Sequence, residues 1–289
     1  MKLLLKFNLI FLLVFLVGLA GSSLVARGLL QQAAKDEVAD RARLLMEKAN
    51  AVSTYTATQI KPLLETQMKY SFLPQSVPAY SSAEVLAALQ KSYPEYSFKS
   101  AMLNPTNPRD RAVAWEEDVV VQFSKSSTLQ EVVGERDTPA GKALYIARPI
   151  RITNPACLQC HTTPDMAPKT LVDRYGPSNG FGWKLNETLG VQVVSVPMDV
   201  PMQRANQALA VVVGVLAAVF LMIGAALNFM LWKLVIQPVS RLSAIADKVS
   251  LGEEAPEFET RSKDEIGVLS ESFGRMRKSL DQAMKMLEA

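Results

Sequence analysis

The chain contains two cysteines and one histidine, and all three lie in the segment Pro155-Ala-Cys-Leu-Gln-Cys-His161. Two thiols separated by two residues and followed directly by an imidazole form the attachment sequence for haem c. Each thiol can form a thioether with one porphyrin vinyl group, while the adjacent imidazole binds the iron. The motif therefore predicts one covalently attached haem c per chain, with Cys157 and Cys160 as attachment residues and His161 as the axial metal ligand.

Three other uses of these residues stay open. A thioredoxin-like dithiol is expected to open a helix in a β-α-β unit, whereas this pair follows a segment with the pattern of a strand. The two cysteines could instead form a plain disulfide, with His161 beside them by chance. A zinc site is disfavoured because the chain lacks the four cysteine or histidine ligands of a structural zinc ion.

The composition restricts the second axial position of the iron. Bis-histidine and thiolate ligation are excluded, so methionine, lysine, tyrosine or an open position remain. Met166 follows His161 too closely to reach the opposite face of the ring. The methionines distant in sequence are Met46, Met68, Met102, Met198 and Met202. An open position would allow gas binding, whereas a methionine ligand would favour redox cycling.

Arg148 is a further candidate cofactor-binding residue. On a strand it would share one face with an otherwise apolar set, Leu144, Ile146, Ile150 and Ile152. A charge on an apolar face needs a partner, and a haem propionate close to the motif would supply one. The alternative is that Pro149 disturbs the strand and leaves Arg148 in solvent.

One uncharged segment precedes this motif in the sequence and another follows it, Phe7 to Ala26 and Ala208 to Trp232. Each is long enough to cross a bilayer, which takes about 20 apolar residues. A composition of 49% hydrophobic and 20% charged residues agrees with a membrane protein. The first segment could be a cleaved signal peptide, but Leu24-Val25-Ala26 is a poor cleavage site, so we expect an uncleaved anchor.

Lys2 and Lys6 favour a cytoplasmic N-terminus, because positive residues are retained on that side of the membrane. We therefore expect a two-pass protein of the bacterial inner membrane, with residues 27–207 in the periplasm and both termini in the cytoplasm. This placement agrees with haem c attachment, which takes place outside the cytoplasmic membrane. The formal net charge of +3 gives no indication of nucleic-acid binding.

The segment 27–207 has the pattern of one α+β domain. Apolar residues at helical spacing predict a long helix over Gln31–Glu65 that continues the first membrane helix. Beyond it, three β-branched and aromatic runs, Asp118–Phe123, Leu144–Ile152 and Gly190–Val196, predict strands of an antiparallel sheet packed beside that helix. About 180 residues can bury one substantial core.

Several segments together resemble the c-type-haem-binding PAS-like sensor domain of bacterial signalling proteins. They are Ser92-Tyr-Pro-Glu-Tyr96, Leu103-Asn-Pro-Thr-Asn-Pro-Arg109, Pro155 to His161, Asp173-Arg-Tyr-Gly176, Gly180-Phe-Gly-Trp183 and Val194-Ser-Val-Pro-Met198. The resemblance covers about residues 35 to 200. It implies a PAS-like antiparallel sheet, thioether attachment at Cys157 and Cys160, and His161 as the proximal ligand. Relatives that use a second cysteine or histidine on the distal side differ from this chain, which has neither.

The segment after the second membrane helix carries two heptad patterns. The first comprises Val235, Val239, Leu242, Ala246 and Val249, and the second comprises Ile266, Leu269, Phe273, Met276, Leu280, Ala283 and Leu287. An acidic connector, Glu253–Glu259, separates them. Two short amphipathic helices cannot bury their seams alone, so a dimeric four-helix coiled coil is expected. With Pro238 after the membrane and Asp264 before the second helix, residues 233–285 resemble a HAMP domain.

Together these features predict a homodimeric membrane sensor, without enzymatic activity, that converts the redox or gas-ligation state of haem c into a signal. The runner-up hypothesis is a membrane-tethered c-type cytochrome for electron transfer, which leaves the cytoplasmic heptads without a role. Only residues 286–289 follow the segment that resembles a HAMP domain. The output is therefore expected from a separate cytoplasmic kinase, cyclase or chemotaxis component, or else the chain is a truncated receptor.

Overall fold

The computed structural model describes residues 3–139, 141–253, 256 and 264–288. The chain forms two compact units. Residues 27–208 make up the first, and the second combines the N-terminal 26 residues with residues 209–289. The two units are described separately below.

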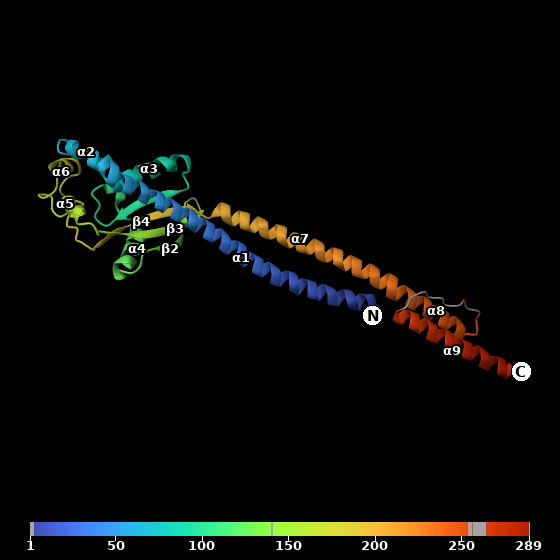
Figure 1. Cartoon of the computed structure of the whole chain (residues 1–289). Helices are drawn as coiled ribbons and strands as arrows, with labels where there is room; N and C mark the ends of the chain where they lie inside the picture. Colours follow the sequence, from blue (N-terminus) through green and yellow to red (C-terminus); the bar gives the residue numbers. More distant parts are fainter. Residues whose placement is uncertain (1–2, 140, 254–255, 257–263, 289) are drawn as a thin grey trace. The chain divides into compact units, whose positions relative to one another are not determined.

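The unit of residues 27–208 is built on a four-stranded antiparallel sheet with the order β1-β4-β3-β2 (Figure 1). The strands are β1 (Ser97–Met102), β2 (Val132–Thr138), β3 (Gly141–Arg151) and β4 (Thr188–Pro197). In the central pair, Ile146 of β3 lies opposite Val194 of β4. The expected antiparallel sheet is thus confirmed, and the strands expected at Leu144–Ile152 and Gly190–Val196 are β3 and β4.

The long helix expected over Gln31–Glu65 is present, but it is interrupted. α1 (Leu3–Tyr55) passes into a π-helical turn (Thr56–Ile60), and α2 (Lys61–Met68) follows. Pro62 lies in the first turn of α2, where its missing N–H is tolerated. The remaining helices of this unit are α3 (Pro78–Ser92), α4 (Ala114–Lys125), α5 (Leu158–His161) and α6 (Lys169–Tyr175), and short 3₁₀ turns occupy Pro74–Ser76, Pro108–Asp110 and Pro155–Cys157.

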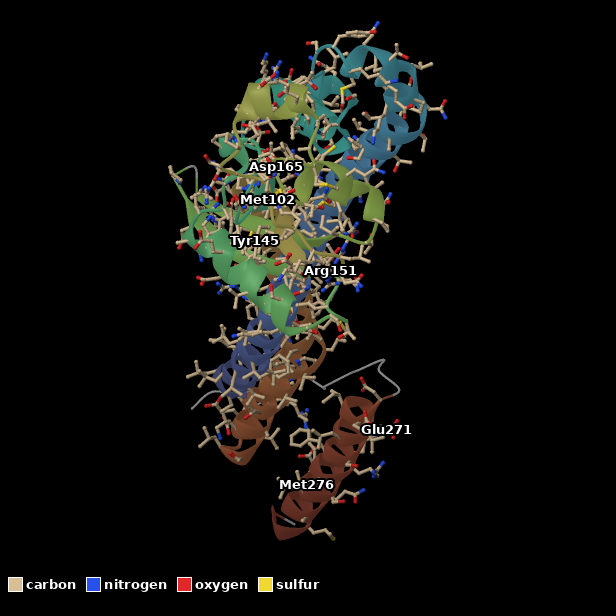
Figure 2. All side chains as sticks on the ribbon, turned by 90° about the vertical axis from the view of Figure 1, so that its left-hand side faces the viewer. Met102, Tyr145, Arg151, Asp165, Glu271 and Met276 are labelled. Atoms are coloured by element: carbon tan, nitrogen blue, oxygen red, sulfur yellow. The ribbon has the colours of Figure 1, made fainter. Side chains whose placement is uncertain are left out.

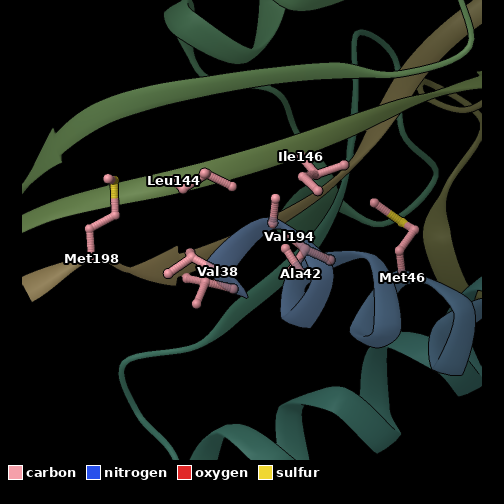
Figure 3. Packing of buried hydrophobic residues seen from close by; sticks show 9 residues of the cluster. Val38, Ala42, Met46, Leu144, Ile146, Val194 and Met198 are labelled. Carbon is pink, nitrogen blue, oxygen red and sulfur yellow. The ribbon is translucent and has the colours of Figure 1, made fainter. Parts of the chain in front are cut away.

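α1 covers one face of the sheet (Figure 3). Val38, Ala42 and Met46 are spaced four residues apart, so they form one stripe of the helix, and each is at most 1% exposed. They pack against alternate residues of the two central strands, among them Ile146 and Val194. This period of two in the strands and about four in the helix explains why these segments form a single core.

α4 covers the opposite face and corrects one of the expected strands. Asp118–Phe123 lies within this helix, so the expectation of a strand there is wrong. The buried Val119, Val120 and Phe123 form one helical stripe and pack against the sheet residues Ala101, Ala147, Val191 and Val193. The Glu116 carboxylate accepts a hydrogen bond from Val113 N at 2.9 Å, which caps the first turn of the helix.

The second unit contains the two segments with membrane-spanning character. Among the described residues, the helices over Leu4–Met68 and Asp199–Ser250 each contain a window that is apolar and long enough to cross a bilayer. The second begins as α7 (Asp199–Leu231), turns through a π-helical segment (Trp232–Ile236) and continues as α8 (Gln237–Ser250).

α9 (Glu265–Glu288) contains the second expected heptad segment. Asp264 Oδ1 accepts hydrogen bonds from the main-chain N of Ile266 and of Gly267, both at 3.1 Å. Asp264 therefore caps the N-terminus of α9, in agreement with its expected position before the second helix. Residues 254–255 and 257–259 of the expected acidic connector lie outside the described residues.

Candidate functional site

The candidate site begins where β3 ends. Arg151, labelled in Figure 2, donates from Nη2 to the main-chain carbonyls of Ser126 at 2.9 Å and Leu129 at 3.1 Å. These bonds tie the end of β3 to the segment that follows α4. Three residues later, Asn154 Oδ1 accepts a hydrogen bond from Ala156 N at 2.9 Å and starts the turn that carries the cysteines. The attachment motif is therefore fixed to the sheet at its N-terminal side.

His161 is oriented by a hydrogen bond across 19 residues of sequence. Its Nδ1 lies 2.7 Å from the carbonyl oxygen of Gly180. Because a carbonyl can only accept, Nδ1 carries the proton and donates. Nε2 then has the free lone pair, and it has no hydrogen-bond partner among the described residues. A backbone carbonyl bound to one ring nitrogen is the usual way in which a metal-binding histidine is oriented, so His161 fits the axial role that the motif predicts.

Burial lowers the pKa of the His161 imidazole, whereas its hydrogen bond to Gly180 raises the pKa. Burial is the larger effect, and the pKa is lowered overall. The imidazole is therefore neutral at neutral pH, and a neutral imidazole is the form that binds a metal.

Glycines shape the loop beneath His161. Gly180 and Gly182 adopt φ values of 80° and 81°, a region that favours glycine. A Cβ on Gly180 would lie only 2.0 Å from Thr106 Oγ1, so the loop could not approach the segment after β1 with a larger residue. Asn104 joins the segment after β1 to this loop with two hydrogen bonds. Its Oδ1 accepts from Gly180 N at 3.2 Å, and its Nδ2 donates to Phe181 O at 3.2 Å.

Trp183 is a site residue that reasoning from residue types did not single out. Its ring stacks on the His161 imidazole, with centroids 3.8 Å apart and planes 12° from parallel. Its indole Nε1 is buried and has no hydrogen-bond partner among the described residues. The segment Gly180-Phe-Gly-Trp183 had appeared only as part of the family resemblance, and that was the signal through which the residue could have been found.

Both cysteines are free thiols and are partly buried. Burial raises the pKa of the Cys160 thiol; the charge of Lys61 lowers this pKa, and Cys157 raises it further. Cys157 does cap the short helix α5, but every strand pairing in the sheet is antiparallel, so the motif is not part of a β-α-β unit. No group of three or more histidine, cysteine, aspartate or glutamate side chains that could hold a metal ion occurs among the described residues.

The methionines considered for the second axial position have different surroundings. Met46 and Met198 are 0% and 3% exposed in the core between α1 and the sheet, and Met202 packs against the same cluster. The sulfur of Met68 accepts hydrogen bonds from Leu73 N at 3.3 Å and from Ser76 Oγ at 3.1 Å. Met102 ends β1 and is partly buried, whereas Met166 is 71% exposed.

Arg148 lies on the face of the sheet that packs against α1, as expected, but its charge has other partners. Its Nε and Nη2 each lie 3.1 Å from the carboxylate of Glu131, and its Nη1 bonds the carboxylate of Glu47 on α1. The expectation of a propionate partner rested on a charge that needed compensation. Two carboxylates of the protein supply that compensation, and Arg148 instead ties α1 to the sheet.

The region around the motif is completed by α2 and α6, which lie at the same end of the domain as α5 (Figure 1). Thr170 Oγ1 donates to Met68 O at 3.2 Å, and the Phe72 and Tyr175 rings meet edge to face with centroids 5.8 Å apart. The segment between β3 and β4 is therefore packed against the end of α2, and its position depends on residues distant in sequence.

Two family models match separate parts of the chain. The Tll0287-like family model matches residues 31–197, and the HAMP domain model matches residues 230–282. The crystal structure of the cyanobacterial heme-protein Tll0287 has a TM-score of 0.44 and 15% sequence identity, over 56% of this chain and 95% of that chain. The methyl-accepting chemotaxis protein TlpA of Bacillus subtilis is 31% identical over 107 residues, which are 37% of this chain and only 15% of the relative. The chain therefore belongs to the Tll0287-like family and carries a HAMP domain after the family's domain, as in a bacterial membrane signalling protein.

Proposed function

We propose that this protein is a membrane-anchored haem c sensor that passes the redox or gas-ligation state of its iron through α7 to the HAMP domain. The observation that carries the proposal is the 2.7 Å hydrogen bond from His161 Nδ1 to Gly180 O, which leaves Nε2 for a metal beside two free thiols. A bound haem would supply an iron that changes oxidation state or takes up a further ligand.

Three residues hold the cofactor in this proposal. Cys157 and Cys160 each provide a thiol for one thioether bond, and His161 provides the axial nitrogen. The proton stays on His161 Nδ1, where the Gly180 carbonyl holds it and fixes the plane of the ring. The proposal assigns no catalytic residue.

A continuous run of structure leads from His161 towards the membrane. Gly180 and Trp183, which contact the imidazole, belong to the loop that enters β4. β4 ends at Pro197, and α7 begins at Asp199, so Met198 alone separates them. Met198 is buried in the core, and its N donates to Lys142 O at 2.8 Å. A displacement of His161 would thus act on a strand that a single residue separates from α7 in the sequence.

The output side of the proposal rests on the HAMP domain. HAMP helices bury their apolar seams in a dimer, so we expect a homodimer through α8 and α9. The similarity to a chemotaxis receptor supports a cytoplasmic output, in this protein or in a separate partner such as a kinase, a cyclase or a chemotaxis component. The expected topology places residues 27–207 in the periplasm and both termini in the cytoplasm.

Covalent haem attachment is tested first. The full chain is produced in a bacterium with haem c maturation enzymes, purified in detergent and extracted with acidified acetone. Haem that stays on the protein, at one per chain by the pyridine haemochrome spectrum, supports the proposal. The double variant Cys157→Ser/Cys160→Ser should lose it. Wild-type protein without covalent haem would contradict the proposal.

Signalling is tested by disulfide cross-linking in membranes. Leu280 is 47% exposed on α9 and occupies an expected seam position, so Leu280→Cys reports on the dimer. The two native cysteines do not interfere when both carry haem. We expect different cross-linking yields in the oxidised, reduced and carbon-monoxide-treated states. Identical yields, together with a six-coordinate spectrum that carbon monoxide does not change, would favour the tethered cytochrome instead.

A further inference from the structure

Trp183 is held rigidly against the imidazole of His161. The two rings stack with centroids 3.8 Å apart, and the Trp183 main-chain N donates to His161 O at 3.2 Å. The preceding residue is held as well, because Gly182 N donates to Thr162 O at 2.9 Å. The indole is thus held through its ring contact with His161, and the residue is held through its backbone.

The indole N–H of Trp183 is a buried donor without an acceptor among the described residues. Buried polar groups are nearly always paired, so this donor calls for an explanation. Tryptophan has no acceptor of its own, so the missing partner must be an acceptor from outside this loop.

We propose that Trp183 Nε1 donates a hydrogen bond to a propionate carboxylate of the haem, which makes Trp183 a cofactor-binding residue. This inference rests on the proposed function, because it requires haem at Cys157, Cys160 and His161. A propionate is an anionic acceptor that arrives with the cofactor, so it explains a donor that is unpaired within the protein. Trp183 thereby takes over the role in propionate binding that was expected of Arg148, because the charge of Arg148 is already paired with Glu47 and Glu131.

The inference is tested on the haem-loaded full chain with Trp183→Phe, which keeps an aromatic ring beside His161 and removes the N–H. A hydrogen bond stabilises the ionised propionate, so its loss should raise the propionate pKa. We expect the pH range over which the midpoint potential falls to move to higher pH. The propionate bending band in the resonance Raman spectrum should shift as well.

Trp115→Phe is the matched control. Trp115 lies on α4 and its ring packs against that of Tyr145 on β3, with centroids 5.2 Å apart, so its substitution should change neither measurement. If Trp183→Phe fails to fold, incorporation of 5-fluorotryptophan leaves the chain intact and makes the indole N–H a stronger donor. The pH range should then move to lower pH, and Trp115→Phe should not abolish this effect.

The two failures are distinguishable. Wild-type protein without covalent haem contradicts the proposed function. Trp183→Phe protein with a full haem content, but with the potential curve and Raman band of the wild type, overturns the inference alone.

Discussion

The side-chain amides of Asn8 and Asn228 hydrogen-bond to each other in both directions, over 2.9 Å and 2.7 Å. Both residues lie in uncharged segments with membrane-spanning character. The contact continues along the helices, since the Phe15 and Phe220 rings lie 4.6 Å apart. An unpaired amide in hydrocarbon is costly, so the reciprocal pair fixes the register of the two helices near the end from which the HAMP helices start.

Removing one partner of this pair should weaken the packing of the two membrane helices. Asn228 Nδ2 also donates to Gly224 O at 2.9 Å, so it keeps a partner in Asn8→Leu, whereas Asn8 keeps none that the structure shows in Asn228→Leu. We expect Asn228→Leu to cost more, up to about 1–2 kcal/mol of helix association. The double variant Phe15→Cys/Phe220→Cys is combined with each asparagine substitution. The yield of the disulfide between these two cysteines of one chain is then measured in membranes. Asn8→Leu/Asn228→Leu together should restore much of the yield, and equal yields in all variants would contradict the prediction.

The two loop glycines offer a comparison at nearly equal φ. Gly180→Ala brings a Cβ to 2.0 Å from Thr106 Oγ1, whereas Gly182→Ala meets no atom within 4 Å. Strain at positive φ should cost each variant about 1–2 kcal/mol of unfolding free energy. Gly180→Ala should lose clearly more and should also retain less haem, because the carbonyl that orients His161 must move. Thermal unfolding and haem content check this, and equal losses in both variants would show that the Thr106 contact is unimportant.

Features that depend on residues close in sequence could be predicted, whereas features that depend on contacts between distant residues could not. The attachment motif was recognisable because thioether chemistry fixes its spacing within five residues, Cys157 to His161. The expected strand at Asp118–Phe123 was wrong because three successive valines, residues 119–121, favour strands locally. The helix there depends on the Glu116 cap and on burial of Val120 and Phe123 against the sheet. The β propensity of the local sequence gives no information about that burial, which depends on contacts with the sheet.

The partners of the site residues were not predictable for the same reason. His161 bonds a carbonyl 19 residues away, and Arg148 bonds Glu47 across 101 residues. Neither pairing leaves a periodic signal in the sequence. The helix α3 (Pro78–Ser92) was not predicted either, although Pro78 occupies its first turn, where proline is tolerated.

Arg148→Leu should separate the structural role of this residue from a role in haem binding. The variant leaves Glu47 without its cation, whereas Arg43 Nε still lies 3.0 Å from the carboxylate of Glu131, so we expect a loss of only about 1 kcal/mol in unfolding free energy. Haem content and midpoint potential should stay at the wild-type values. Thermal unfolding and a redox titration of the same sample measure both properties. A shifted potential with unchanged stability would return Arg148 to the cofactor site.

The Glu47–Arg148 ion pair should make stability depend on pH in the acid range. The hydrogen bond and charge of Arg148 hold the pKa of Glu47 below its usual value. The native state then binds fewer protons than the unfolded state between the lowered and the usual pKa, so stability falls as the pH drops through this window. Wild type should be more stable than Glu47→Gln at pH 7, and the difference should shrink below about pH 4. Melting curves from pH 7 to pH 3 check this, and a constant difference would show that the pair does not contribute.

Met46 and Met198 should not bind the iron, because both sulfurs lie in the core between α1 and the sheet. Met46→Leu and Met198→Leu keep nearly the same volume, so each should cost less than about 1.5 kcal/mol and leave the ferric and ferrous spectra unchanged. Lys61 is the informative contrast, because its charge acts on Cys160 and it begins α2 directly after the π-helical turn. If Lys61 is the second ligand, Lys61→Ala should open the position and allow carbon monoxide to bind the ferrous protein more readily. A carbon monoxide spectrum of each variant decides among the three, and a changed spectrum in Met46→Leu or Met198→Leu would contradict the prediction that these core methionines do not bind the iron.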